Sequence, residues 1–278
     1  MGGFPTARTL LLGAALAFLP AIPAGAETEE AFPHAAAAYL VRIDHRETWS
    51  HRANLRLPPA SLTKIMTALL ALEHGRLRDS VTVSRRAAAE TGMRLGLRAG
   101  ERYRAADLLA ATLLQSANDA CHALAEHLAG SERAFVARMN RRASELGLSD
   151  THFANACGHD DPRHYSSAHD LARLAETALA QPLFADLTAR VETSIATLDG
   201  RRNFRLVNRN ELVGRYPGAT GVKSGYTPQA GKCLVAYARR NETAVMAVLL
   251  NAPDRWWTAV AMLDRAFAEA HIRQAAAP

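Results

Sequence analysis

The sequence predicts a mixed α/β domain in which one antiparallel sheet takes strands from both ends of the chain and the middle of the chain is helical. Three observations predict this class: strand-like segments early in the chain, helical periodicity through its middle, and a strand pair followed by a helix near its end. The sheet is expected to be flanked by helices, with the helical middle as a subdomain. About 250 residues follow the N-terminal leader described below, a length that allows one large core and also allows two smaller domains.

The N-terminus has the layout of a secretory signal peptide. Arg8 supplies a positive charge, an apolar run covers residues 10–19, and small residues follow at 24–26. The apolar run is well short of the ~20 residues that a membrane-spanning helix needs. We therefore expect a signal peptide over residues 1–26, no stable membrane anchor, and a single secreted domain over 27–278.

Two short strands are expected at the start of this domain, over residues 36–43 and 49–55, joined around Asp44 to Glu47. Pro58 and Pro59 break the chain, so a helix should begin after them at Ser61. Its apolar positions recur at helical spacing until Gly75, which suits the residue that follows a helix C-terminus.

The middle of the chain predicts helices over residues 106–114, 120–128 and 132–146, each with an apolar stripe and a glycine or polar break. Ser167 and Asp170 form the pattern of a capping box, which opens another helix running towards Pro182.

Strand-compatible residues return over 204–207, 232–239 and 243–250. The last two segments are separated by three polar residues, which favours an antiparallel hairpin. The final helix, expected over 256–270, carries Trp256, Val260, Leu263 and Phe267 on one face and should pack on the sheet.

Charge and cysteine content narrow the function class. The net charge of +6 suits a polyanionic neighbour such as cell-wall polymer, and secretion argues against nucleic acid as a partner. Cys121, Cys157 and Cys233 are spaced too widely for a redox or zinc motif. At most one internal disulfide can form among them, and the simplest interpretation is three small buried side chains.

Lysine is rare and informatively placed. Of the 33 basic residues, only Lys64, Lys223 and Lys232 are lysine, and all others are arginine. A guanidinium does not release its proton in a protein, whereas a desolvated ammonium can. A codon bias towards arginine would explain the scarcity of lysine but not its placement.

Ser61 and Lys64 form an S-x-x-K pattern at the predicted start of a helix. Residues three apart on a helix share a face, so the amine can reach the hydroxyl and remove its proton. Backbone N–H groups at the helix N-terminus can stabilise a developing oxyanion. Alone, this pattern fits a helix N-cap at Ser61 equally well.

Two further patterns strengthen the case for a catalytic serine. Ser116 and Asn118 lie in a turn between two predicted helices, where one can relay a proton and the other can hold a substrate amide. Lys223, Ser224 and Gly225 lie at a predicted strand edge, where a cation and a hydroxyl can bind a carboxylate beside a residue without a side chain. In isolation, an ordinary turn and a solvated loop explain these two triplets.

Together, S-x-x-K, S-x-N and K-[TS]-G in this order resemble the signatures of penicillin-binding proteins and serine β-lactamases. The likeness covers nearly the whole mature chain, from residue 36 to 267. The segments that most resemble low-molecular-weight D-alanyl-D-alanine carboxypeptidases are residues 61–68, 115–120, 151–155 and 221–227.

The resemblance implies the serine β-lactamase/DD-peptidase fold and a reaction without metal or cofactor, on peptidoglycan stem peptides, with β-lactam antibiotics as covalent inhibitors. It implies Ser61 as the nucleophile, Lys64 as its base, and Ser116 as the proton donor to the departing D-alanine. The remaining implied roles are substrate binding by Asn118, Lys223, Ser224 and Gly225, and an oxyanion hole from the backbone N–H groups of Ser61 and Tyr226.

The chain departs from the family pattern twice. Ser224 stands where threonine is usual, which keeps the hydroxyl. Many relatives continue into a small β domain and an amphipathic membrane-binding helix. Because this sequence ends at Pro278, we expect no C-terminal β domain here.

Four other interpretations remain. A His/Asp-rich stretch over residues 152–169 could suggest zinc, but its spacing matches no compact metal motif. A serine β-lactamase shares the three patterns, but no E-x-x-L-N segment lies between Ser116 and Lys223. A DD-endopeptidase would differ only on the leaving-group side. A wall-binding module with a degenerate site is disfavoured because every polar group that the mechanism needs is present.

Overall fold

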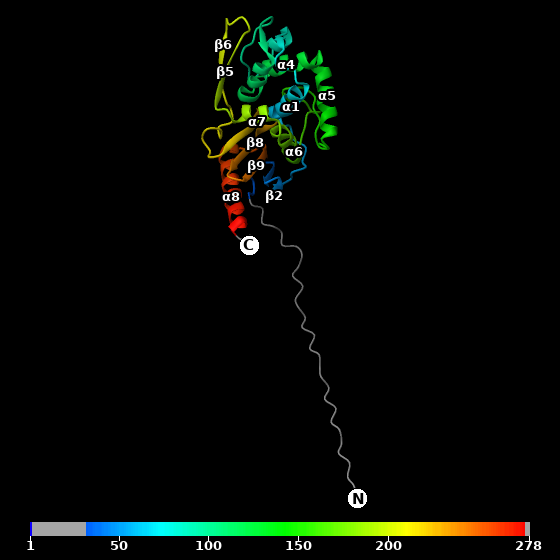
Figure 1. Cartoon of the computed structure of the whole chain (residues 1–278). Helices are drawn as coiled ribbons and strands as arrows, with labels where there is room; N and C mark the ends of the chain where they lie inside the picture. The colour runs from blue at the N-terminus through cyan, green and yellow to red at the C-terminus, as the bar shows by residue number, and fades with distance from the viewer. Residues whose placement is uncertain (2–31, 276–278) are drawn as a thin grey trace. The chain divides into compact units, whose positions relative to one another are not determined.

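A computed structural model describes Met1 and residues 32–275, and the predicted signal peptide at 1–26 lies almost wholly outside these residues. The central element of residues 32–275 is a five-stranded antiparallel sheet in the order β2-β1-β9-β8-β7 (Figure 1). Its strands are β1 Ala38–Ile43, β2 Arg46–His51, β7 Ala219–Thr227, β8 Gly231–Arg240 and β9 Thr243–Leu250. The prediction that both ends of the chain supply the sheet is confirmed.

Helices account for most of the remaining regular structure. They are η1 Ala60–Thr63, α1 Lys64–His74, α2 Arg85–Ala88, α3 Ala105–Ala110, η2 Ala111–Gln115, α4 Asn118–Ala129, α5 Glu132–Glu145, α6 Ala168–Leu179, α7 Pro182–Ala189 and α8 Arg255–Ala275. Two small strand pairs lie outside the main sheet, namely β3 Ser80–Thr82 with β4 Arg102–Arg104 and β5 Glu192–Ala196 with β6 Asn203–Val207.

The alternation of side chains along the strands divides the core into two parts. On β9, Val248 and Leu250 face the larger core, which also contains side chains of α1, α4 and α6. Val245 and Leu249 face the other side, where α8 packs through residues such as Leu263. The expected packing of the last helix on the sheet is therefore confirmed, and both faces of β9 are buried.

The second strand differs from its predicted bounds of 49–55. Ile43 pairs with Arg46, so the hairpin turn consists of Asp44 and His45 alone. Both residues have positive φ, of 47° and 66°, which is the backbone of a tight two-residue hairpin turn. The strand consequently begins three residues earlier than predicted and ends at His51.

The capping predictions are partly right. Gly75 has φ 75° at the end of α1, and Ser167 Oγ accepts a hydrogen bond from the N–H of Asp170 as expected. The Asp170 carboxylate does not complete a capping box, because it accepts from the N–H of Asp150 and from the Thr151 hydroxyl. Pro182 begins an additional helix, α7, that the sequence analysis missed.

Within the described residues, no helix has both the length and the apolar character to span a membrane.

Candidate active site

The three sequence patterns meet in one cleft of about 550 Å³. Its wall is formed by η1, the turn before α4, the segment after Ala156, and the edge strand β7. Of the predicted site residues, six line the cleft: Ser61, Ser116, Asn118, Ser224, Gly225 and Tyr226. Lys64 and Lys223 do not line it, since both are buried behind it.

Ser61 and Lys64 are in hydrogen-bond contact, with Nζ of Lys64 at 3.0 Å from Oγ of Ser61. Ser61 lies within the 3-10 turn η1, and Lys64 is the first residue of α1. In a 3-10 turn, side chains three residues apart are eclipsed, so this geometry brings the amine directly over the hydroxyl. The predicted pairing is found, although Ser61 is neither an N-cap nor part of the α-helix.

The Lys64 amine has no exposed surface and three oxygen neighbours. Besides Ser61, it donates to Oδ1 of Asn118 at 2.7 Å and to the backbone carbonyl of Cys157 at 2.6 Å. Burial lowers the pKa of Lys64 from 10.5 to about 7, against the opposing effect of the negative charge on Glu90. Near neutral pH this amine can therefore accept a proton from the hydroxyl that it contacts.

Ser116 and Asn118 owe their placement to an irregular helix end. Helix α3 continues into the π-helical turn η2, and Ser116 follows with a left-handed φ of 59°. Asn118 then begins α4 and donates through Nδ2 to the carbonyl of Thr91 at 2.6 Å. Because its Oδ1 accepts from Lys64, both ends of this amide are bound to protein, and Asn118 orients the lysine as well as lining the cleft.

Gly225 has a packing role that the sequence analysis did not predict. A Cβ at this position would lie 2.9 Å from the backbone nitrogen of Ser61 and 3.2 Å from the carbonyl oxygen of Pro59. The absence of a side chain thus lets β7 approach η1 closely. On the same strand, Ser224 Oγ donates to the carbonyl of Arg209 at 3.4 Å, and the Tyr226 side chain is exposed at the rim.

Lys223 lies in a positively charged environment. Its Nζ donates to the carbonyl of Ser224 at 2.9 Å. Burial, followed by the positive charges of Lys64, Arg255 and Arg209, holds its pKa well below the usual value. The cations that line the cleft itself are Arg209 and Arg255. The sequence analysis missed these two residues, because nothing in the sequence separates them from the many other arginines.

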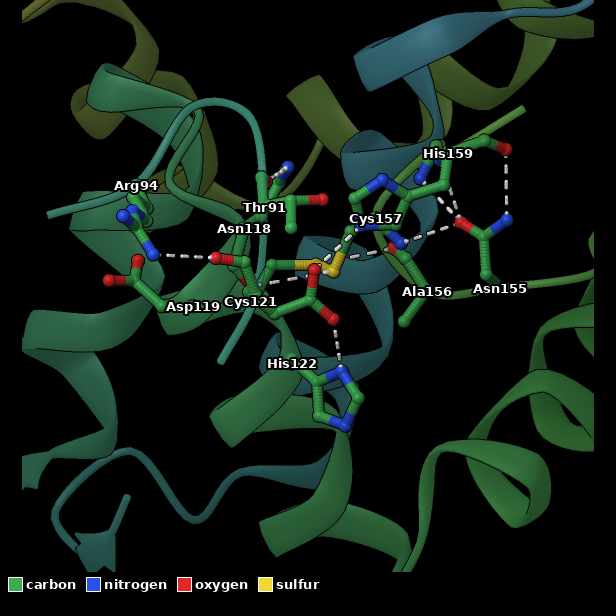
Figure 2. Close-up of polar contacts among 12 residues, drawn as sticks. Thr91, Arg94, Asn118, Asp119, Cys121, His122, Asn155, Ala156, Cys157 and His159 are labelled. Carbon is green, nitrogen blue, oxygen red and sulfur yellow. Dashed lines mark hydrogen bonds and ion pairs between the residues drawn. A yellow bond between two sulfur atoms is a disulfide. The ribbon is translucent and has the colours of Figure 1, made fainter. Parts of the chain in front are cut away.

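A disulfide joins Cys121 to Cys157 (Figure 2). Cys233 is a free, buried thiol. The simplest sequence interpretation, three unpaired buried cysteines, is therefore wrong for two of them. The pair is 36 residues apart in sequence, with a Cα–Cα distance of 6.0 Å. It ties the first turn of α4, just after Asn118, to the residue whose carbonyl contacts Lys64.

Residues 155–160, the bridging segment, connect the parts of the site. Oδ1 of Asn155 accepts from the N–H of Gly158 at 2.7 Å and from that of His159 at 3.0 Å, which fixes the turn. A Cβ at Gly158 would lie 2.0 Å from the carbonyl oxygen of Ala60, so this backbone packs directly against η1. Asp160 accepts from the hydroxyl of Thr227 at 2.5 Å, which ties the segment to the end of β7.

The His/Asp-rich stretch is dispersed into separate contacts. Nε2 of His164 lies 2.7 Å from the Thr63 hydroxyl, and burial lowers the pKa of His164 to about 4. His159 contacts Glu90, and Nδ1 of His152 contacts the carbonyl of Arg163. Across residues 32–275, no group of three or more histidine, cysteine, aspartate or glutamate side chains is placed to hold a metal ion.

The family model for D-alanyl-D-alanine carboxypeptidases, Peptidase S11, matches residues 29–254. Among curated proteins, the chain is 38% identical over 274 residues to the D-alanyl-D-alanine carboxypeptidase DacF of Bacillus subtilis, covering 94% of this chain and 70% of that protein. It is 37% identical over 226 residues to DacB2 of Mycobacterium tuberculosis, covering 77% of this chain and 76% of that one.

Solved structures of related proteins have the same fold. A point mutant of the Streptomyces K15 DD-transpeptidase superposes with a TM-score of 0.79 at 28% identity, covering 84% of this chain and 98% of that chain. Penicillin-binding protein D2 of Listeria monocytogenes, solved in an ampicillin-bound form, superposes with a TM-score of 0.74 at 27% identity over the same shares. The predicted fold class is confirmed by these superpositions.

Proposed function

The chain belongs to the D-alanyl-D-alanine carboxypeptidase family, and from this membership we propose how its own residues perform the reaction. The substrate is a peptidoglycan stem peptide that ends in D-alanyl-D-alanine. The observation that carries the proposal is the 3.0 Å contact between Ser61 Oγ and a fully buried amine whose pKa is about 7.

Acylation begins when neutral Lys64 takes the proton of the Ser61 hydroxyl. Oγ attacks the carbonyl carbon of the penultimate D-alanine, and the bond to the terminal D-alanine nitrogen breaks. Ser116 relays a proton to that nitrogen, and the terminal D-alanine leaves as the free amino acid. Water then attacks the ester on Ser61, which releases the shortened peptide and returns a proton to Oγ.

Binding of the substrate uses the β7 side of the cleft. Ser224 supplies a hydroxyl, and Arg209 and Arg255 supply positive charge for the terminal carboxylate, whose binding would favour the protonated form of buried Lys223. The N–H groups of Ser61 and Tyr226 receive the oxyanion, which the close approach of β7 to Ser61 at Gly225 supports. Asn118 holds the Lys64 amine and borders the peptide.

β-Lactams should acylate Ser61 by the same attack, because their ring carbonyl presents the same target beside a carboxylate. The ampicillin-bound form of the Listeria relative supports this assignment. We place the reaction outside the cytoplasm, in the periplasmic or cell-wall space, on the strength of the sequence pattern at residues 1–26 and the substrate class.

The main alternative reaction, cleavage of a peptide cross-link, differs from the proposed one in its leaving group. A DD-endopeptidase would use the same nucleophile on a peptide cross-link, and the Streptomyces neighbour is named as a transpeptidase, which passes the acyl group to an amine. Incubation with a pentapeptide and with a cross-linked muropeptide, with product analysis for free D-alanine, cleaved cross-link and amine-transfer product, separates the three. We expect free D-alanine from the pentapeptide as the main product.

The test of the nucleophile is intact-mass measurement after incubation with penicillin, followed by peptide mapping. One adduct is expected, on the peptide that contains Ser61, and none on a Ser61→Ala variant. A Ser61→Ala protein that still releases D-alanine, or an adduct on another residue, overturns the proposal.

A further inference from the structure

Glu90, which follows α2, joins the two sides of the active site through a pair of histidines. Its Oε1 lies 2.6 Å from Nδ1 of His122, and its Oε2 lies 2.8 Å from Nε2 of His159. His122 belongs to α4, one turn after Asn118, and His159 belongs to the bridging segment. Figure 2 shows the two histidines on either side of the Cys121–Cys157 disulfide, so this polar link runs beside the covalent one.

The Glu90 carboxylate is held in its charged form. Burial opposes ionisation, but hydrogen bonds from His122 and His159 and the charges of those rings lower the pKa of Glu90 to about 2. Two other carboxylates face His122: Glu126 of α4 at 3.4 Å and Glu132 of α5 at 3.8 Å. They raise the pKa of His122 together with Glu90, against the effect of burial.

His159 connects Glu90 to the wall of the cleft. It lines the cleft together with Ser61 and Asn118, and its side chain is 36% exposed. Its neighbour Gly158 packs against η1, and Cys157 beyond it supplies the carbonyl that Lys64 contacts. Anchoring of the His159 ring therefore restricts the backbone on which the Lys64 amine rests.

We propose that Glu90 is a positioning residue for acylation of Ser61: through His159 it holds the bridging segment against Lys64, and its negative charge acts on the same amine. The inference rests on the proposed roles of Ser61 and Lys64. The two routes have distinguishable consequences, because a mechanical effect changes the maximum rate and a charge effect changes the pH at which Lys64 titrates.

Glu90→Gln separates this role from that of an ordinary structural carboxylate. The rate of penicillin acylation, measured from pH 5 to 9, should fall about tenfold at its high-pH plateau because His159 loses its charged partner. Its acid limb should also move to lower pH, by on the order of half a unit, because the charge that favours protonated Lys64 is gone. A role in folding alone would lower the melting temperature and leave the limb in place.

Two variants complete the design. His159→Ala should lower the plateau in the same way but should not move the acid limb downward, because Glu90 keeps its charge. Glu126→Gln is the matched control, since it removes a carboxylate that contacts the same His122 from the far side. This variant should leave both the plateau and the limb as they are in the wild type.

The inference is overturned if Glu90→Gln acylates within twofold of the wild type with an unmoved acid limb, or if Glu126→Gln reproduces its effects. Failure of the proposed function has a different signature, because the wild type itself would then form no adduct on Ser61.

Discussion

The two buried lysines of the active site lie in opposite electrostatic surroundings. Lys64, at the start of α1, has three oxygen neighbours, including the Ser61 hydroxyl, and feels the negative charge of Glu90. Lys223, on the edge strand β7, donates to the Ser224 carbonyl, and the charges that act on it are those of other cations. Both are fully buried, so burial alone does not distinguish them.

The difference shows how one residue type serves two purposes. Around Lys64, burial lowers the pKa of the amine and the charge of Glu90 offsets part of that effect, which leaves the pKa at about 7 and suits the amine to exchange protons with Ser61. On the β7 side, the charges that act on Lys223 are those of Lys64, Arg255 and Arg209, and this arrangement favours the binding of a carboxylate. In the proposed mechanism, the helical side of the cleft performs the chemistry and the strand side selects the substrate.

Lys64→Arg should have the largest effect on the rate of acylation. Arginine keeps the positive charge but cannot give up its proton, so acylation of Ser61 by penicillin should fall about 1000-fold. Lys232→Arg is the matched control, because Lys232 is exposed on β8 and donates to the Pro253 carbonyl. Its acylation rate should match the wild type, and an active Lys64→Arg enzyme would contradict the assigned base.

Lys223→Met should weaken substrate selection more than chemistry. Methionine keeps much of the side-chain volume but removes the amine, whose protonated form a bound carboxylate would favour, so kcat/KM for a peptide ending in D-alanyl-D-alanine should fall about 100-fold. The same peptide with an amidated C-terminus carries no charge to recognise and should lose much less. Steady-state kinetics on the two peptides measure the ratio, and an equal loss on both would argue against carboxylate recognition on the β7 side.

Loss of the Cys121–Cys157 disulfide should have the smallest effect on rate. The bond closes a 36-residue separation, so a Cys121→Ser/Cys157→Ser variant should lose about 4 kcal/mol of stability. Acylation should slow about fivefold, because the Cys157 carbonyl is held less firmly against Lys64. The preference for free over amidated peptide should stay unchanged, since β7 is untouched.

The free thiol provides the control for that experiment. A Cys233→Ala protein keeps the disulfide and should slow on reduction as the wild type does, whereas the double serine variant should no longer respond to reductant. Melting temperature and acylation rate are followed together. If reduced wild-type protein, with three free thiols, acylates as fast as the oxidised protein, the disulfide does not position Lys64.

Much of this site could be predicted from the sequence because its determinants are local. Ser61 and Lys64 are three residues apart, Ser116 and Asn118 share one turn, and Lys223 begins a contiguous triplet. The hairpin of β8 and β9 and the termination of α1 at Gly75 are local in the same sense.

The remaining features depend on contacts between distant segments. Arg209 and Arg255 come to line the cleft only in the folded chain, and the pairing of Cys121 with Cys157 requires the path of the bridging segment. Glu90 lies in no recognisable sequence motif, and it contacts His122 of α4 and His159 only in the folded chain. The reason for glycine at position 225 was likewise set by the packing of η1, which no local pattern shows.

The scarcity of lysine permits a direct test of the central claim. Protein labelled at the lysine ε-carbon has three signals, from Lys64, Lys223 and Lys232, and single Lys→Arg variants assign each one. An NMR titration should show the Lys64 signal changing at about pH 7, together with the acid limb of Ser61 acylation. A Lys64 signal that titrates near pH 10, with an acylation rate that is flat between about pH 6 and 9, would contradict the account.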